Sequence, residues 1–479
     1  MTPRSSRLAD AAQPLLASLA EARQRSEPGT PRAERQPVHT VYGGAQLFRA
    51  NIAERLGARA RQALDRYAPD PFTFAKALGL RGADAIPDKK KAAKAYLATY
   101  DKKPEAARTE SRDLHRLCVV YERVRRKLED EPVEDYRIDF EDGFGVRPDE
   151  EEDAVAVVAA MEVAKGLDSG SLPPFLGIRI KPLSGDLASR SVRTLDLFFL
   201  RLLEKTAGRL PPDFAVTLPK VTLPQEVEIL AQLLGQLEET ADLPVGSLRV
   251  ELLIESPRAI FDREGRFNLP RLLDAASGRV RGVHFGPWDY AAACGIAAPS
   301  QRMDHPASDL ALFLLQLAYA ERGVFLADGP STVLPLPLHR VEDPADLSKK
   351  QLKENREVVQ AAWADCYRDI QRSLDHGFFQ GWDLHPAQIP VRYAASYEYF
   401  LLGLDDVAER LRHFLGKAAR AVATGNRFDD AATGRGLLAF FARGYRAGAL
   451  QDEDLALGDL RPEDLEEPSL EAVLARRAP

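Results

Sequence analysis

Short apolar runs of strand type alternate with amphipathic helical stretches along most of this chain. Helical periodicity is clear, for example, at 191–207, 224–238 and 308–322. The strand-like runs, rich in β-branched and aromatic residues, lie at 38–42, 136–140, 175–180, 214–218, 249–254, 281–285, 323–327 and 379–384. Alternating strands and helices predict a parallel sheet with right-handed crossovers. Eight such units predict a closed (β/α)8 TIM barrel, and an open doubly wound sheet is the alternative.

The pattern changes outside the alternating region, and these changes predict the domain organisation. Residues 1–36 are polar and interrupted by prolines, which indicates an N-terminal arm. We expect the barrel to span 37–394, with a helical insert at about 50–130 after the first strand. A helical C-terminal region is expected over 395–479, beginning with helices at 395–424 and 431–446.

Composition narrows the class of protein. The 479 residues are 45% hydrophobic, enough for a sizeable core, and the net charge of −7 argues against a nucleic-acid or anionic-membrane surface. Cys118, Cys294 and Cys366 form no CxxC pair, so we expect reduced thiols rather than a disulfide frame or a zinc site. No apolar run is long enough for a membrane helix, and no secretory signal is evident. We therefore expect a cytoplasmic protein.

Glu255 and Asp289 form the most informative pair of candidate site residues. Each follows an apolar strand, and about one βα unit separates them, so neighbouring barrel strands would bring both carboxylates to one rim. Two carboxylates brought together repel each other unless a cation lies between them. Mg²⁺, or Mn²⁺ in its place, suits two carboxylates completed by water and substrate oxygens. The alternative is that each residue caps the helix that follows it.

Arg179 lies within a buried strand, where an arginine requires a partner. Its fork suits a substrate carboxylate or an enolate oxygen. It would also suit a salt bridge to Asp139 or Glu141 on the neighbouring strand, and both roles are compatible. Strand alternation places Asp139 and Glu141 on one face and Asp142 in the loop. Glu141 would either bind the metal through water or hold Arg179.

Five further residues are candidates for substrate binding or for support of the site. Lys220 ends the fourth strand and adds positive charge at the rim. Gly286 and Pro287 form the turn before Asp289. Trp288 would line the pocket or pack in the core, and His385 would be a base or a structural residue.

Together these motifs resemble the HpcH/HpaI aldolase and citrate lyase beta-subunit family, which is similar to malyl-CoA lyase and, more distantly, to malate synthase. The resemblance rests on the acidic motif 139–143, Arg179, Glu255 in Leu-Ile-Glu-Ser, Asp289 in Gly-Pro-Trp-Asp-Tyr and the His-Pro-x-Gln-Ile stretch within 381–389. It implies Glu255 and Asp289 as Mg²⁺ ligands and Arg179 as a catalytic residue. It also implies a base beyond the barrel, where Asp430 matches best and Asp429 is its rival.

The resemblance implies a Mg²⁺-dependent carbon–carbon lyase or aldolase. Its substrate would be a small 2-oxo or hydroxy acid or the CoA thioester of one, cleaved through a stabilised enolate. We expect it to work as a homo-oligomer. One alternative is a malate-synthase-like Claisen condensation of an acyl-CoA with a 2-oxo acid, which the Trp-Asp-Tyr form of the motif favours. The other is a non-catalytic metabolite-binding barrel, against which the intact Arg179, Glu255 and Asp289 argue.

Overall fold

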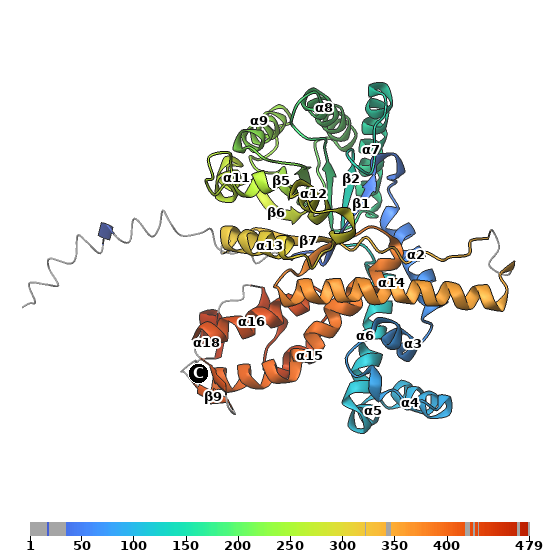
Figure 1. The fold of residues 1–479 in the computed structure, drawn as a ribbon. Helices are drawn as coiled ribbons and strands as arrows, with labels where there is room; N and C mark the ends of the chain where they lie inside the picture. The colour runs from blue at the N-terminus through green and yellow to red at the C-terminus, as the bar shows by residue number, and fades with distance from the viewer. Residues whose placement is uncertain are drawn as a thin grey trace, which may run out of the picture.

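Eight parallel strands close into a barrel in a computed structural model of the chain (Figure 1). The structure describes residues 17–18, 35–320, 322–341, 346–416, 422–424, 427–429, 431–466 and 470–477. The strands are β1 (His39–Gly44), β2 (Asp135–Asp139), β3 (Phe175–Arg179), β4 (Ala215–Leu218), β5 (Arg249–Ile254), β6 (Val280–Phe285), β7 (Phe325–Pro330) and β8 (Gln380–Asp383). Each expected strand overlaps one of these. The (β/α)8 barrel is confirmed, and pairing of β1 with β8 excludes the open sheet.

Helices cover the outside of the barrel between successive strands. They are α7 (Asp149–Ser169), α8 (Leu187–Thr206), α9 (Pro224–Thr240), α10 (Pro257–Ile260), α11 (Leu269–Ala275), α12 (Pro287–Ala293), α13 (Pro306–Tyr319) and α14 (Lys349–Asp375). The four acidic residues in the first turn of α7 face the positive end of the helix dipole. One of them, Glu152, is buried and accepts a hydrogen bond from Thr194, so it also ties α7 to α8.

The expected helical insert after β1 is present as five helices. They are α2 (Ile52–Tyr67), α3 (Pro71–Leu78), α4 (Lys90–Lys102), α5 (Pro104–Glu110) and α6 (Arg112–Asp130). Asp70 accepts hydrogen bonds from Phe72 N at 3.1 Å and Thr73 N at 3.0 Å, which fixes the start of α3. Gly79 ends this helix in the left-handed conformation, at φ +74°.

The C-terminal region contains the helices α15 (Ile389–Gly416), α16 (Ala431–Arg446), α17 (Asp452–Leu457) and α18 (Leu470–Arg477). The expected helix over 395–424 begins earlier, because Ile389 continues directly from the short helical turn Pro386–Gln388. It ends at Gly416, and Val422–Thr424 (β9) pairs with Arg427–Asp429 (β10) in a small hairpin. The predicted boundary at residue 395 therefore falls inside α15.

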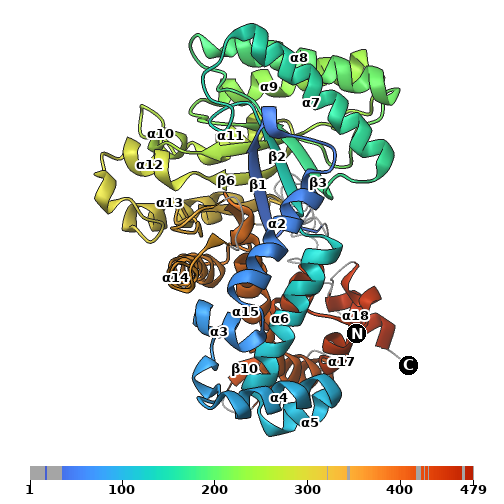
Figure 2. The ribbon, with the colours of Figure 1, turned by 90° about the vertical axis from the view of Figure 1, so that its right-hand side faces the viewer.

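The insert and the C-terminal helices pack against each other beside the barrel (Figures 1 and 2). Glu398 on α15 accepts a hydrogen bond from Arg81 N at 2.6 Å. Arg123 on α6 pairs with Asp454 on α17 at 2.7 Å. These two regions, far apart in sequence, thus form one helical body that flanks the barrel.

The lower part of the barrel interior is charged rather than apolar. Arg137, with 0% of its surface exposed, donates from Nε to Glu251 Oε2 at 2.7 Å and also pairs with Asp135. Arg281 donates to Glu251 Oε1 at 3.0 Å. A buried charge is tolerated only when it is paired and hydrogen-bonded, as these groups are. The network occupies the interior beneath the carboxyl ends of the strands.

Candidate active site at the carboxyl ends of the strands

Arg179 is the best-anchored charged residue at the carboxyl ends of the strands. It ends β3 with 4% of its surface exposed. Its Nε and Nη2 donate to the two carboxylate oxygens of Asp139, at 2.7 and 2.5 Å, and its Nη1 lies 2.9 Å from Glu141 Oε2. Both salt bridges considered from the sequence are therefore formed. A guanidinium has five N–H groups, so two are left after these three contacts.

The ammonium group of Lys220 lies among three carboxylates. It forms an ion pair with Glu141, and its Nζ is 3.3 Å from Asp142 Oδ1 and 3.9 Å from Asp289 Oδ2. Burial of the ammonium opposes its charge, but the hydrogen bond to Glu141 and the nearby acids raise the pKa of Lys220 above its ordinary value. Its backbone has φ +51°, a left-handed conformation uncommon for lysine. Lys220 thus brings the charge of a cation to this acidic cluster.

Glu255 is the buried carboxylate of the cluster, with 5% of its surface exposed. Its Oε2 accepts a hydrogen bond from the backbone N–H of Lys220 at 2.9 Å. Burial raises the pKa of Glu255 to about 7, helped by the charges of Glu141 and Asp289 and opposed by those of Arg179 and Lys220. The carboxylate therefore lies where additional positive charge would stabilise its ionised form.

Asp289 lies one helical turn beyond the strand end rather than on it. Gly286 is the N-cap of α12, Pro287 is its first residue, and Asp289 is half exposed in the first turn. A Cβ atom at Gly286 would lie 2.5 Å from Glu255 Cγ, so only glycine leaves room for that side chain. Trp288 Nε1 donates to Pro330 O at 3.2 Å, which ties α12 to β7.

The donor set fits a hard divalent cation. Glu255 and Asp289 offer carboxylate oxygens on neighbouring units of the barrel, and Glu141 and Asp142 lie within reach of the same Lys220 ammonium. Carboxylates with room for water and substrate oxygens match Mg²⁺ and Mn²⁺. Among the described residues there is no group of three or more His, Cys, Asp or Glu side chains arranged as a ready metal cage. A cation here would be completed by water or substrate.

Tyr42 and His284, which lie beneath the site, were not predicted as functional from the sequence. Tyr42 on β1, His284 on β6 and Trp382 on β8 lie inside the barrel below Arg179. Tyr42 precedes the Gly43-Gly44 end of the first expected strand, the one local signal that placed it near the rim.

The candidate His385, and Asp328 at the end of β7, both have structural partners. The Nδ1 of His385 accepts a hydrogen bond from Ala387 N at 3.1 Å and caps the turn that follows. Asp328 is buried and accepts hydrogen bonds from Ser373 on α14 and from Gly329 N. Asp328 thus faces α14 rather than the carboxylate cluster.

Asp430, the expected base, lies outside the described residues. The hairpin strand β10, which ends at Asp429, lies at the end of the helical body away from the barrel (Figures 1 and 2). The 28-residue helix α15 leads from the barrel to this hairpin. At 1.5 Å per residue, such a helix spans about 40 Å.

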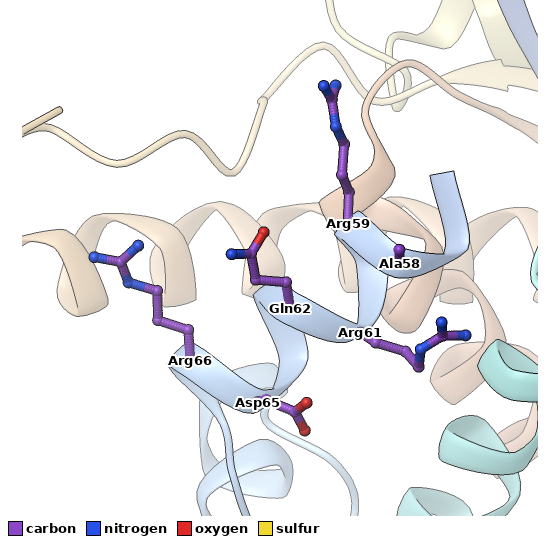
Figure 3. Close-up of a pocket in the computed structure, with 6 residues that line it drawn as sticks. All are labelled: Ala58, Arg59, Arg61, Gln62, Asp65 and Arg66. Carbon is purple, nitrogen blue, oxygen red and sulfur yellow. The ribbon is translucent and has the colours of Figure 1, made fainter. Parts of the chain in front are cut away.

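A basic pocket of about 780 Å³ lies along α2 (Figure 3). Its lining residues are Ala58, Arg59, Arg61, Gln62, Asp65 and Arg66. Arg61 donates to Leu128 O, and Asp65 accepts from Arg125 at 2.7 Å, so both are held by α6. Arg59 forms no ion pair within the described part of the chain and points away from α6.

None of the helices in the described ranges has the length and apolar character needed to cross a membrane. The three cysteines are unpaired.

Comparison with known proteins identifies a family and a fold. The sequence model of a family described as a domain of unknown function (DUF6986) matches residues 16–473. No curated protein matches the chain. A citrate lyase from Burkholderia xenovorans superposes with a TM-score of 0.50 at 19% identity, covering 71% of this chain and 92% of that chain. This likeness is one of fold alone.

Two further solved structures match less closely. RipC from Yersinia pestis has a TM-score of 0.35 at 22% identity, covering 56% of this chain and 90% of that one. A malate synthase from Haloferax volcanii, in a ternary complex with pyruvate and acetyl-CoA, has a TM-score of 0.38 at 17% identity, covering 71% and 88%.

Proposed function

We propose that this chain, which belongs to the DUF6986 family, is a Mg²⁺-dependent carbon–carbon lyase or aldolase. Its substrate would be a small 2-oxo or hydroxy acid or the CoA thioester of one. The observation that carries the proposal is the arrangement of Glu141, Asp142, Glu255 and Asp289 around one lysine, next to an arginine with two free N–H groups.

Glu255 and Asp289 would hold the cation, with Mn²⁺ as a substitute for Mg²⁺. When bound, such an ion polarises a carbonyl oxygen and stabilises negative charge on it. Arg179 would direct its two free N–H groups to the same oxygen or to the substrate carboxylate. Cleavage of the bond leaves an electron pair on the carbon beside the carbonyl, as an enolate. A proton must then reach that carbon, for which we propose Asp430.

The positive charge of Lys220 supports a role for this residue in substrate binding. Its ammonium forms an ion pair with Glu141 and lies 3.9 Å from Asp289, so it would lie next to the cation. Because like charges repel, entry of a divalent cation should displace the ammonium toward Glu141 and Asp142. Lys220 would then bind an anionic group of the substrate beside the ion.

The thioester form of the substrate is supported by the basic pocket on α2. Burial lowers the pKa of His385, and the positive charges of Arg59 and Arg340 lower it further, so both arginines lie near the end of β8. Neither forms an ion pair within the described ranges. Guanidinium groups suit phosphates, which a CoA thioester carries and a free acid does not.

A malate-synthase-like condensation is the second candidate. It is favoured by the Trp288-Asp289-Tyr290 form of the motif after β6 and would use the same residues in the opposite direction. A panel of acyl-CoA and 2-oxo-acid pairs, assayed in both directions with and without Mg²⁺, separates the two reactions. A non-catalytic barrel would bind acids from the panel without turnover.

Metal binding is the first prediction. Glu255→Ala and Asp289→Ala should each weaken Mg²⁺ or Mn²⁺ binding by at least about tenfold, because each removes an anionic ligand. Isothermal titration calorimetry measures the affinity. Glu264→Ala, which removes an exposed carboxylate on the loop after β5, is the matched control and should leave affinity unchanged. Wild-type affinity in Glu255→Ala would disprove the assignment.

A further inference from the structure

The ring of Tyr42 supports Arg179 from beneath. The guanidinium carbon of Arg179 lies 4.9 Å from the centre of the Tyr42 ring. The ring centre of Trp382 lies 4.6 Å away from the same ring, at an interplanar angle of 32°. The Tyr42 hydroxyl is 3.1 Å from Nδ1 of His284. The ring is thus held from its side and from its tip, with Arg179 over it.

The hydrogen bond at the tip has a defined direction. Burial raises the pKa of Tyr42 well above its ordinary value, so the phenol keeps its proton. Burial also lowers the pKa of His284 to about 4, so the imidazole is neutral at pH 7. Tyr42 therefore donates to Nδ1, and the imidazole proton lies on Nε2, 3.7 Å from Glu251 Oε2. Glu251 is itself fixed by Arg137, which anchors the whole chain of contacts to the charged interior.

The contacts of Arg179 with Asp139 and Glu141 do not by themselves fix the plane of its guanidinium group. Asp139 and Glu141 bind the edge of the guanidinium and set the direction of its N–H groups. These contacts lie around the edges of the group, so they restrain motion perpendicular to its plane less than motion within it. A ring against one face opposes that tilt, and a cation over an aromatic face is also attracted to it.

We propose that Tyr42 is a positioning residue for the reaction of the proposed enzyme. Its ring face fixes the plane of the Arg179 guanidinium, so that the two free N–H groups point at the substrate oxygen. The packing of Trp382 against the ring holds it in place, and the hydrogen bond from its hydroxyl to His284 adds a smaller restraint. The inference rests on the proposed function, because it assigns Arg179 to the oxygen that gains charge.

Progressive fluorination of the ring separates attraction from shape. Phenylalanine, 3,5-difluorophenylalanine and 3,4,5-trifluorophenylalanine at position 42 have similar shapes but increasingly weak negative ring faces. The rate measured is Mg²⁺-dependent exchange of the methyl protons of pyruvate for solvent deuterium, followed by NMR. We expect kcat to fall stepwise, by roughly 3- to 10-fold across the series, with KM within about twofold. The unfolding midpoint should stay constant.

A matched control exists in a second arginine–aromatic contact. Arg443 lies 3.9 Å from the centre of the Phe379 ring. The C-terminal helices pack against this ring. The same fluorinated residues at position 379 should leave kcat unchanged. Substitutions with standard amino acids supply a further check. Tyr42→Phe should keep most of the rate. Tyr42→Leu should lower kcat by about tenfold.

The outcomes distinguish this inference from the proposed function. Exchange that depends on Mg²⁺ but is indifferent to fluorination at position 42 would overturn the positioning role and leave the proposed function standing. An equal loss in Tyr42→Phe and Tyr42→Leu would also overturn it, because the hydroxyl rather than the ring would then matter. Absence of Mg²⁺-dependent exchange in the wild type would overturn the proposed function and this inference with it.

Discussion

Arg179 combines a structural and a proposed chemical role in one side chain. Two of its N–H groups donate to Asp139, its Nη1 forms an ion pair with Glu141, and its face is covered by Tyr42. A substrate would therefore meet a donor whose direction is already fixed. Such preorganised donors are effective because they do not reorganise when charge develops in the transition state.

Arg179→Lys tests this role while keeping the charge. Lysine cannot reproduce the fork that spans Asp139 and Glu141, so the donor would lose its fixed direction. We expect kcat to fall by about 10²–10³-fold, the usual loss for a removed transition-state contact. Steady-state kinetics on the best substrate of the panel measures it. A rate close to that of the wild type would make Arg179 a purely structural residue.

At the residue scale, sequence patterns predicted the charged residues better than the aromatic ones. Arg179 and Glu255 were predictable because each follows an apolar run, so its place at a strand end is a local property. Tyr42 and His284 meet only because β1 and β6 face each other across the closed barrel. Strand alternation assigns a residue to one of two faces, but it does not identify the residue opposite.

The connection from β6 to α12 shows how one short element builds part of the site. Phe285 ends the strand, Gly286 caps the helix and Pro287 begins it, which places Asp289 in the first turn. The φ of Gly286, −103°, is accessible to other residues, so the glycine is required for space rather than for backbone freedom. That space is filled by Glu255.

Gly286→Ala should therefore damage the site through its neighbour. The added methyl would lie 2.5 Å from Glu255 Cγ and 2.8 Å from its Oε1, so the carboxylate must move. We expect Mg²⁺ affinity to fall by about tenfold or more, measured by calorimetry. Gly436→Ala, in α16 with no atom within 4 Å of the added methyl, is the control. It should raise stability by about 0.5–1 kcal/mol, because alanine favours helix. Equal metal affinity in both variants would contradict this account.

At the element scale, the strands and barrel helices were predictable because each has a strong period of its own. The boundaries of the helices were less predictable from the sequence. The helix expected from 395 begins at Ile389, because Pro390 is tolerated in a first turn and does not delay the start. The hairpin of β9 and β10 was missed, because two strands of three residues each carry too short a pattern.

Within its described residues, the molecule consists of a barrel and a flanking helical body built from the insert after β1 and the C-terminal helices. The sequence indicated an insert and a C-terminal helical region, but not that α6 and α15 pack together. Contacts between the insert and the C-terminal helices join residues more than 250 positions apart, such as Arg81 and Glu398. No periodicity within either segment encodes its partner.

The charged barrel interior links strands from the whole barrel and should make stability depend on pH. Burial lowers the pKa of His284 to about 4. The nearby Arg137 and Arg281 lower this pKa further, and Glu251 and Asp135 raise it. Because the folded state disfavours the imidazolium, stability is complete above the unfolded pKa of about 6.5 and is lost as pH falls toward 4. The loss from this group is about 3 kcal/mol.

His284→Asn removes that titration. Calorimetric unfolding midpoints between pH 7 and 4 should fall less steeply in this variant than in the wild type. The exposed His413 provides the control, and His413→Asn should follow the wild-type curve. Parallel curves for His284→Asn and the wild type would exclude His284 as the source of the acid sensitivity.

The distance between β10 and the barrel bears on assembly. Asp430 would act as the base in its own subunit or in a neighbour's; we propose the neighbouring copy of a homo-oligomer, since the described strand β10 lies at the other end of α15 from the barrel (Figure 1). Asp430→Asn and Arg179→Ala, each inactive alone, should regain up to about a quarter of wild-type activity when mixed as subunits, because hybrid contacts pair intact halves. Mixed assemblies that stay inactive would place the base within the same chain.

The position of Lys220 bears on whether the protein folds before or after it binds a metal ion. Its left-handed backbone, strained by roughly 1–2 kcal/mol, is retained where its ammonium offsets the acids around it. The cluster therefore carries its own tethered counterion. Zinc fingers, in contrast, depend on metal to fold. We expect the proposed enzyme to fold without a bound magnesium ion, so a shortage of the ion would leave a folded protein that can bind it later.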